Sequence, residues 1–309
     1  HKYVMPRVTP VEAIEMIKKD ARSKNYNNSG FLFFENAFGF NFKSYESLFC
    51  RADGSPRAVK ANYTPKVKNI MSSGDKGKEI YELQSVEDFK VKTQYNTLNN
   101  LQNGVYASRL VSHDAFNKTF TETDFDYHKD YAKHNHLESD SNGGVRDDNG
   151  ILPLFNFSKG KSFSDFPEGT LMFSTDTQNI HNGVTSIPFN EIIQQRVSSH
   201  LAINSLVLEI TVSGSTTINV GDIVHFSLPK YAKATAKDIK DQDVYLTGRY
   251  LISAARHHIS SINKKHTMVL ELIKDSYNKA YPDENMDIFT NNEDDKGKIY
   301  IQGQIDDLT

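Results

Sequence analysis

The segment from residue 206 to residue 275 constrains the fold most, because its apolar side chains recur at every second position. That period is typical of β-strands with one buried face, and the first strand would bury Leu206, Leu208, Ile210 and Val212. Further strand-like segments, separated by turn-rich or polar stretches, follow at residues 218–226, 245–259 and 266–274. Because an antiparallel sheet removes its unpaired edges by closing on itself, these residues predict a closed or nearly closed β-barrel.

The N-terminal residues predict a second, smaller unit. Residues 9–12 form a helix start, since the threonine can cap, the proline suits the first helical position and the glutamate completes a capping box. The phenylalanine-rich residues 31–42 have the pattern of a β-hairpin in which Phe40 and Phe42 point inward. A helix packed on this hairpin would make a small helix–hairpin domain.

We therefore predict an α+β chain, with a small helix–hairpin domain plus an antiparallel β-barrel built from discontinuous segments. The predicted boundaries are residues 1–78 for the helix–aromatic hairpin domain with its linker, 79–126 and 186–275 for the β-barrel domain, 127–185 for a polar insertion, and 276–309 for an acidic C-terminal tail.

Four shorter predictions lie within these boundaries. Residues 51–78 are polar and contain several glycines and prolines, which favours a loop or linker. Residues 127–150 are hydrophilic and predict an exposed excursion. A helix is expected at residues 189–202, with an apolar face formed by Ile192, Ile193, Val197 and Leu201. In the tail, residues 298–301 form an isolated edge strand that could pair with a neighbouring subunit.

The charge balance argues against a general affinity for polyanions. The formal net charge is −3 at pH 7, from 36 Lys and Arg against 39 Asp and Glu, and the basic clusters are only two residues long. The one cysteine, Cys50, follows Leu48 and Phe49, so we expect a buried thiol without an intrachain disulfide, which fits a reducing cytoplasm. No run of about 18 apolar residues is present, so we expect no membrane partner.

The weak candidates for metal ligands are His128, His134 and His136, with Glu138 and Asp140 nearby. Imidazole and carboxylate groups are proper ligands for zinc and similar ions. A metal site also needs rigid outer support for its ligands, which a glycine- and asparagine-rich loop does not supply. We therefore expect a solvated loop here, with neither a metal nor another cofactor.

Three segments, taken in order, resemble the baseplate or tail hub family of contractile-tailed phages, which is related in fold to the hub part of type VI secretion spikes. The first is the capped helix with the aromatic hairpin and the turn at Ser44–Leu48. The second is the helix at residues 190–202 leading into the strand at 206–212. The third contains Val220-Gly221-Asp222-Ile223-Val224, then Gly248-Arg249-Tyr250-Leu251-Ile252, then residues 257–275, and is similar to the closing half of a hub barrel.

The resemblance covers about half of the chain and implies a structural virion component without catalytic residues. Hubs of this family form a homotrimeric ring of barrels that joins the tail tube to the central spike protein. Baseplate wedge proteins are further possible partners, DNA is met only in passage through the ring, and assembly takes place in the host cytoplasm. The sequence departs from the family in two respects. Such hubs begin with another barrel before the helical unit, and the insertion at residues 127–150 has no counterpart.

We expect no enzyme, and two alternatives from other classes stay open. Asp124 and Asp126 share one face of an expected strand and could form the carboxylate pair of a tail-associated glycan hydrolase. A carbohydrate-binding module without catalysis is the other alternative. The sequence contains no Gly-x-Ser-x-Gly elbow, phosphate-binding Gly-rich loop, His-Glu-x-x-His or paired-cysteine motif.

Overall fold

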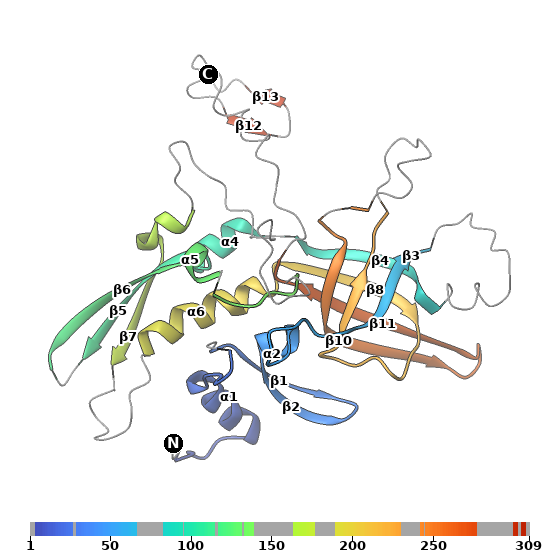
Figure 1. The fold of residues 1–309 in the computed structure, drawn as a ribbon, viewed down its shortest axis with the longest axis horizontal. Helices are drawn as coiled ribbons and strands as arrows, with labels where there is room; N and C mark the ends of the chain where they lie inside the picture. The colour runs from blue at the N-terminus through green and yellow to red at the C-terminus, as the bar shows by residue number, and fades with distance from the viewer. Residues whose placement is uncertain are drawn as a thin grey trace.

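The computed structural model describes residues 4–26, 29–66, 83–94, 96–114, 117–131, 133–138, 163–176, 189–229, 242–243, 245–276, 299–301 and 304–306. The chain is mixed α+β, as predicted. A six-stranded barrel and a three-stranded sheet lie at the two ends of the long axis, with helix α6 (Phe189–Ala202) between them (Figure 1). The division of the chain into domains remains a prediction.

The barrel is closed and its strand order is β10-β11-β8-β4-β3-β9. These strands are β3 (Val59–Pro65), β4 (Ser85–Gln94), β8 (Leu206–Ser213), β9 (Ile223–Phe226), β10 (Gly248–Ser260) and β11 (Lys265–Lys274). The alternation predicted for the first strand is confirmed, because its inward side chains are fully buried: Leu206, Leu208, Ile210 and Val212. Aromatic and aliphatic side chains from the other strands, among them Tyr63, Phe226 and Tyr250, complete the core.

The prediction of a wholly antiparallel barrel is wrong at one strand. β3 runs parallel to both of its neighbours, with Thr64 opposite Ser85 of β4 and Val59 opposite Ile223 of β9. The strand lies inside residues 51–78, where a loop or linker was predicted. Its outward residues are polar or exposed and few of its side chains reach the core, so its sequence carries no clear alternation.

The second sheet has the order β6-β5-β7, from β5 (Ala107–Asp114), β6 (Thr119–Asp126) and β7 (Leu171–Asp176). Two of these strands lie within residues 79–126, which were assigned to the barrel, although only β4 of that range belongs to it. β7 lies in the predicted polar insertion and pairs with β5 in parallel. Short helices flank the sheet, namely α4 (Thr97–Gln102), α5 (Tyr127–Tyr131), η1 (Phe163–Asp165) and η2 (Pro167–Gly169).

Helix α6 lies where the sequence predicted it, but its buried face contains polar as well as apolar side chains. Gln194 is buried and its Nε2 donates to the Ser108 carbonyl at 2.8 Å and to the Thr123 carbonyl at 3.2 Å. Ser198 donates to the Val105 carbonyl at 2.7 Å. These bonds attach the helix to the three-stranded sheet, so side-chain hydrogen bonds supplement an apolar stripe.

The N-terminal unit contains α1 (Pro10–Asp20), the hairpin β1 (Phe31–Asn36) and β2 (Gly39–Ser44), and α2 (Tyr45–Phe49). The capping box is confirmed, with the Thr9 side chain bonded to the Glu12 amide and the Glu12 carboxylate bonded to the Thr9 amide. The side chains of α1 from Pro10 to Lys19 are exposed or half-buried. Leu32 and Phe34 of the hairpin pack against barrel residues, so the hairpin shares its core with the barrel.

The outer face of the hairpin carries four phenylalanines, contrary to the inward direction predicted for two of them. Phe31 stacks on Phe42 and Phe33 stacks on Phe40, with ring centroids 5.0 and 5.8 Å apart. Phe40 is 73% exposed, and Phe42 is also exposed. The alternation of β2 was predicted correctly, but the face that is buried was not, because either face of a hairpin can pack against a neighbouring element.

Substitutions on the two faces of this hairpin are expected to have unequal effects. Phe34→Ala should lower the free energy of unfolding by about 2–3 kcal/mol, since it removes apolar contact with the barrel. Phe40→Ala, on the exposed face, should change it by less than about 0.5 kcal/mol. Urea unfolding of the two variants measures the difference, and equal losses would contradict this placement of the hairpin.

Three smaller predictions have outcomes in the structure. Cys50 is a buried free cysteine, and burial raises the pKa of its thiol to about 11, as expected for an inert thiol. Residues 299–301 form β12 (Ile299–Ile301), which is not isolated because it pairs with β13 (Gln304–Asp306) of the same chain. None of the described helices is long and apolar enough to cross a membrane.

Candidate functional site

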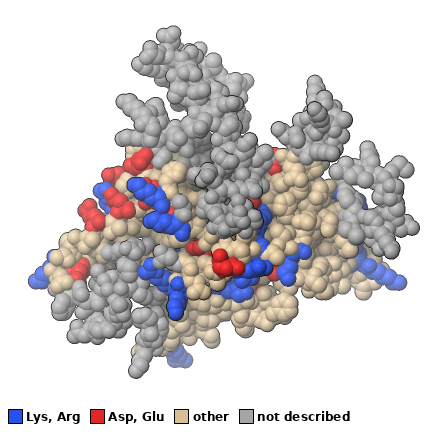
Figure 2. Space-filling view, in the orientation of Figure 1, with Lys and Arg blue, Asp and Glu red and all other residues tan. Residues whose placement is uncertain are grey.

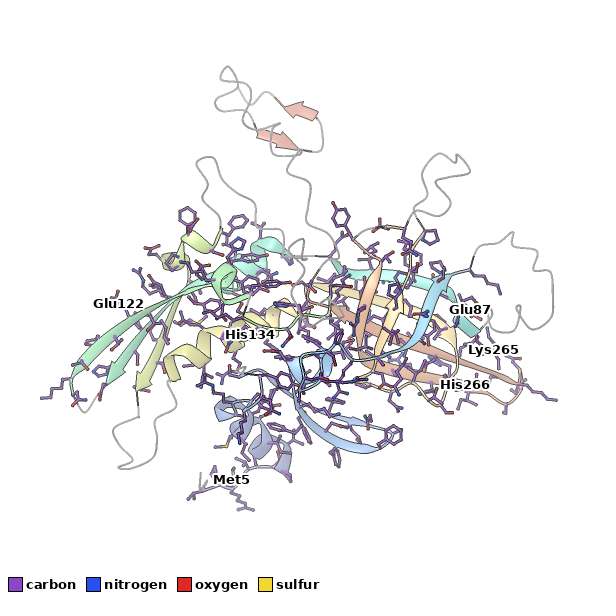
Figure 3. The ribbon with its side chains drawn as sticks, viewed as in Figure 1. Met5, Glu87, Glu122, His134, Lys265 and His266 are labelled. Atoms are coloured by element: carbon purple, nitrogen blue, oxygen red, sulfur yellow. The ribbon has the colours of Figure 1, made fainter. Side chains whose placement is uncertain are left out.

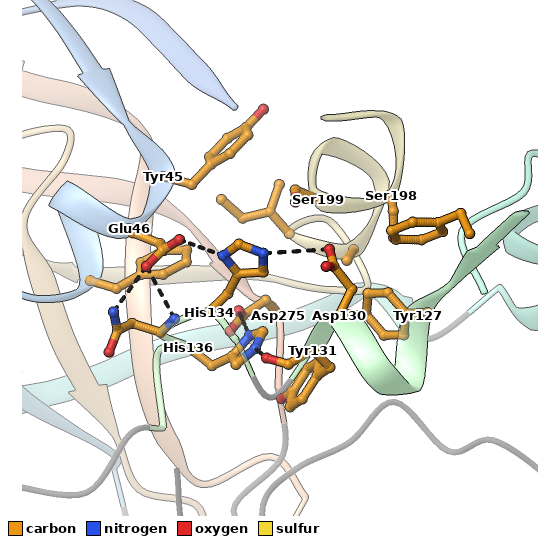
Figure 4. Close-up of a pocket in the computed structure, with 15 residues that line it drawn as sticks. Tyr45, Glu46, Tyr127, Asp130, Tyr131, His134, His136, Ser198, Ser199 and Asp275 are labelled. Atoms are coloured by element: carbon orange, nitrogen blue, oxygen red, sulfur yellow. Dashed lines mark hydrogen bonds and ion pairs between the residues drawn. The ribbon is translucent and has the colours of Figure 1, made fainter. Parts of the chain in front are cut away.

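The polar residues 127–138 lie at the junction of the barrel, α2 and α6, in a pocket shown in Figure 4. An exposed excursion was predicted here, and for the described part of it that prediction is wrong: Tyr127, Tyr131, His134 and Leu137 are buried. The residues that bury them come from distant parts of the sequence. The segment therefore looks hydrophilic in the sequence, although its polar groups have partners inside the protein.

His134 is held between two carboxylates. Its Nδ1 lies 2.8 Å from Glu46 Oε1, on α2, and its Nε2 lies 3.4 Å from Asp130 Oδ2, on α5 (Figure 4). The amide of Gln195, on α6, also contacts Nε2. Burial by itself lowers the pKa of His134, but the hydrogen bonds that its ring donates to the Asp130 and Glu46 carboxylates outweigh burial and raise the pKa to about 9.

Glu46 supplies the second half of this junction. Burial favours its neutral form, yet hydrogen bonds from His134 and Asn135 outweigh burial and lower the pKa of the carboxyl. Asn135 donates to Oε2 from its backbone nitrogen at 3.2 Å and from its side-chain nitrogen at 2.9 Å. The junction is thus an ionised, hydrogen-bonded cluster. It joins α2, through Glu46, and α5, through Asp130, to residues 134–135.

His136 and His128 serve other purposes. His136 Nδ1 lies 2.8 Å from Asp275 Oδ2, its Nε2 lies 3.0 Å from the Tyr131 carbonyl, and its ring stacks on that of Tyr131. His128 is half-buried on α5, and burial lowers its pKa. His134 and His136 therefore have separate partners. Within the described ranges, no group of three or more His, Cys, Asp or Glu could hold a metal ion.

The raised pKa of His134 makes part of the stability depend on pH. Because the folded-state pKa of about 9 lies above the ordinary value of 6.5, the stabilisation is complete below pH 6.5 and is lost as the pH rises through about 9. The pKa values of the Glu46 and Asp130 carboxyls are lowered, so the stability that these carboxylates contribute is lost when they are protonated at acid pH.

We expect the unfolding free energy of the wild type, relative to that of His134→Gln, to fall between about pH 6.5 and pH 9.5. Urea unfolding of both proteins at several pH values measures this difference and cancels the titration of other groups. A difference that stays constant over this range would contradict an ionised His134.

The two aspartates proposed as a catalytic pair are engaged in ion pairs. Asp124 accepts two hydrogen bonds from Arg109, from Nε at 2.7 Å and from Nη2 at 2.9 Å, and these lower the pKa of its carboxyl. Asp126 lies 3.0 Å from the ammonium of Lys129. They line an open groove with Asp130, whose pKa is lowered too, chiefly by His134 against the effect of burial. A glycosidase general acid needs a raised pKa, whereas the pKa of Asp124 is lowered, so Asp124 is not suited to that role.

Large apolar side chains are exposed at several places, including residues 4–16 and Leu98, and three of these places lie on strands or their turns. The first is the outer face of the β1–β2 hairpin with Phe40. The second is the three-stranded sheet, where Phe120 and Phe173 are exposed. The third is the β10–β11 turn, where Ile262 is 92% exposed. Sequence patterns located the strands but could not show which apolar side chains remain uncovered.

The solved structures that are similar to this chain include two tail proteins. The chain is similar to the tail protein from Neisseria meningitidis MC58, at 10% identity and a TM-score of 0.35, over 73% of this chain and 48% of that one. It is also similar to the 43 kDa tail protein of prophage MuSo2 from Shewanella oneidensis, at 10% identity and a TM-score of 0.39, over 88% of this chain and 54% of that one. The chain thus spans about half the length of each. No family model and no curated protein matches it.

Proposed function

We propose that this protein is a structural subunit of a phage-type tail or baseplate, a hub that self-associates into a homotrimeric ring joining the tail tube to the central spike. The observation that carries the proposal is the set of separate exposed apolar surfaces on the hairpin, the sheet and the barrel end. Exposed apolar patches on a soluble protein are typical of contact surfaces. A hub needs several of them, since it contacts its own copies and proteins on both sides.

The barrel supports the same proposal. The third of the resembling segments, which is similar to the closing half of a hub barrel, has three parts that form neighbouring strands, with β9 paired to β10 and β10 paired to β11. Gly221, in the first of these parts, has a φ of +88°, and a Cβ there would lie 2.8 Å from the Phe34 ring. Glycine at this position therefore lets the aromatic hairpin pack closely against the barrel.

The charge distribution is compatible with a ring through which DNA passes. On the face shown in Figure 2, basic side chains are interspersed with acidic and uncharged ones. With a formal charge of −3 on each copy, a ring would repel phosphates rather than retain them. The proposed partners are the tube and spike proteins, with wedge proteins as further candidates, and the proposed location is the virion after assembly in the host cytoplasm.

Light scattering coupled to size exclusion, at two salt concentrations, tests the proposal. A trimer with three times the 35.0 kDa mass of the chain is expected. A monomer at every concentration, or hydrolysis of a glycan that Asp124→Asn abolishes, would contradict a purely structural hub.

A further inference from the structure

We propose that copies of this chain associate head to tail, with the tip of the β10–β11 hairpin of one copy seated on the open face of the β6-β5-β7 sheet of the next. The inference rests on the self-association proposed above and names the two surfaces that meet. Both surfaces are on the same chain, both are apolar at their centre, and their charges are opposite.

The open face of the sheet is defined by three rows of cross-strand neighbours. The registers place Asp124, Arg109 and Leu171 in one row, Glu122, Val111 and Phe173 in the next, and Phe120, His113 and Thr175 in the last. Phe120, Leu171 and Phe173 are strongly exposed. The opposite face contacts α6 through Gln194, so the exposed rows form the outer side of the sheet.

The charges on this open face are mainly negative. Its one cation, Arg109, is already bonded to Asp124 and lies 3.4 Å from Glu168. Glu122 is exposed in the middle row. Lys118 lies in the turn beyond the last strand pair and not in a row. An apolar centre with surplus carboxylates favours a partner that is apolar and basic.

The tip of the β10–β11 hairpin has those properties. Beyond the barrel end, Ile259 is 76% exposed, and Ile262 in the turn is also exposed. Lys264 is exposed in the same turn, whereas Arg256 is exposed on the other face of β10 from Ile259. Lys265 is exposed too, 3.0 Å from Glu87. The charged side chains visible at this tip in Figure 2 are basic.

The positions of the two surfaces require a head-to-tail contact. Figure 3 shows Glu122 at one end of the long axis and Lys265 with His266 at the other. One chain therefore cannot bring its own two surfaces together, so a contact between them joins two different copies. Contacts between two different surfaces generate a closed ring when the rotation between copies closes. Three elongated subunits that meet at their ends satisfy this condition.

Charge exchange across the contact provides the test. Lys264→Glu and Glu122→Arg each place like charges together, so each should weaken self-association at least about tenfold at low salt. The double variant Glu122→Arg with Lys264→Glu restores opposite charges and should associate within about threefold of the wild type. Lys24→Glu is the control, because it reverses an exposed charge outside both surfaces and should have no effect.

Sedimentation velocity over a range of concentrations, with circular dichroism to confirm folding, measures these effects. A wild-type trimer that neither single variant weakens would overturn the head-to-tail contact and leave the hub proposal standing. Weakening by both singles without recovery in the double variant would also overturn it, since the two charges would then not face each other. A wild type that stays monomeric would overturn both proposals.

Discussion

Replacing Glu46 by alanine is expected to lower the free energy of unfolding by about 3–5 kcal/mol, because it leaves a buried imidazolium with half of its counter-charge. The carboxylate is buried and lies 2.8 Å from His134 Nδ1. It also accepts both hydrogen bonds from Asn135. After the substitution only Asp130, 3.4 Å from the other ring nitrogen, faces the charge. Urea unfolding near neutral pH measures the loss.

Two further variants separate charge from local packing. Glu46→Gln keeps an acceptor oxygen for Asn135 but removes the negative charge, so its loss should be smaller, about 1.5–3 kcal/mol. Glu35→Ala removes an exposed glutamate from β1 and should change stability by less than about 0.5 kcal/mol. If Glu46→Ala were as stable as Glu35→Ala, the ionised junction would not exist.

Lys274 at the end of β11 is the second position with a large expected effect. Its side chain is fully buried, with the ammonium 2.8 Å from Glu138 Oε1 and 3.1 Å from the Thr247 carbonyl. The ammonium also lies 5.3 Å from the centre of the Tyr250 ring. Burial lowers the pKa of Lys274, while Glu138 opposes this effect. Lys274→Met should cost about 3–5 kcal/mol, because Glu138 would lose its cation in a nearly buried position.

The loss should be largely reversible by a second substitution. In Lys274→Met with Glu138→Gln, no uncompensated charge remains, and the amide oxygen can still accept the hydrogen bond that the Arg249 backbone nitrogen now donates to Glu138. We expect recovery of about 2 kcal/mol or more relative to Lys274→Met alone. Additive losses in the double variant, measured by the same unfolding experiment, would show that the pair does not act as one unit.

The pattern of local elements could be predicted where it depends on neighbours in the chain. The capping box at Thr9 and Glu12 has both of its bonds, because all of its groups lie within one helical turn. The strand from Leu206 alternates as expected, since a two-residue period reports burial of one face directly. The helix that ends at Ala202 was also predicted in the correct place.

The candidate site could not be predicted, because the partners that keep its groups ionised and buried are distant in the sequence. His134 and Glu46 are 88 residues apart, and His136 and Asp275 are 139 residues apart. In the sequence, this histidine-rich segment is indistinguishable from a solvated loop. Only the folded chain supplies the carboxylates that make its burial favourable.

The sequence by itself thus determined the helix start, the hairpins and the alternating strands of the barrel, since each depends on short-range periodicity and capping. The tertiary structure alone decided three other features: the parallel placement of β3, the pairing of β5 with β7, and the face of the hairpin that is buried. The physical reason is that the partner of a strand and the surface that covers it come from residues distant in sequence. An alternating pattern indicates that one face of a strand is buried, but it does not identify the element that buries this face.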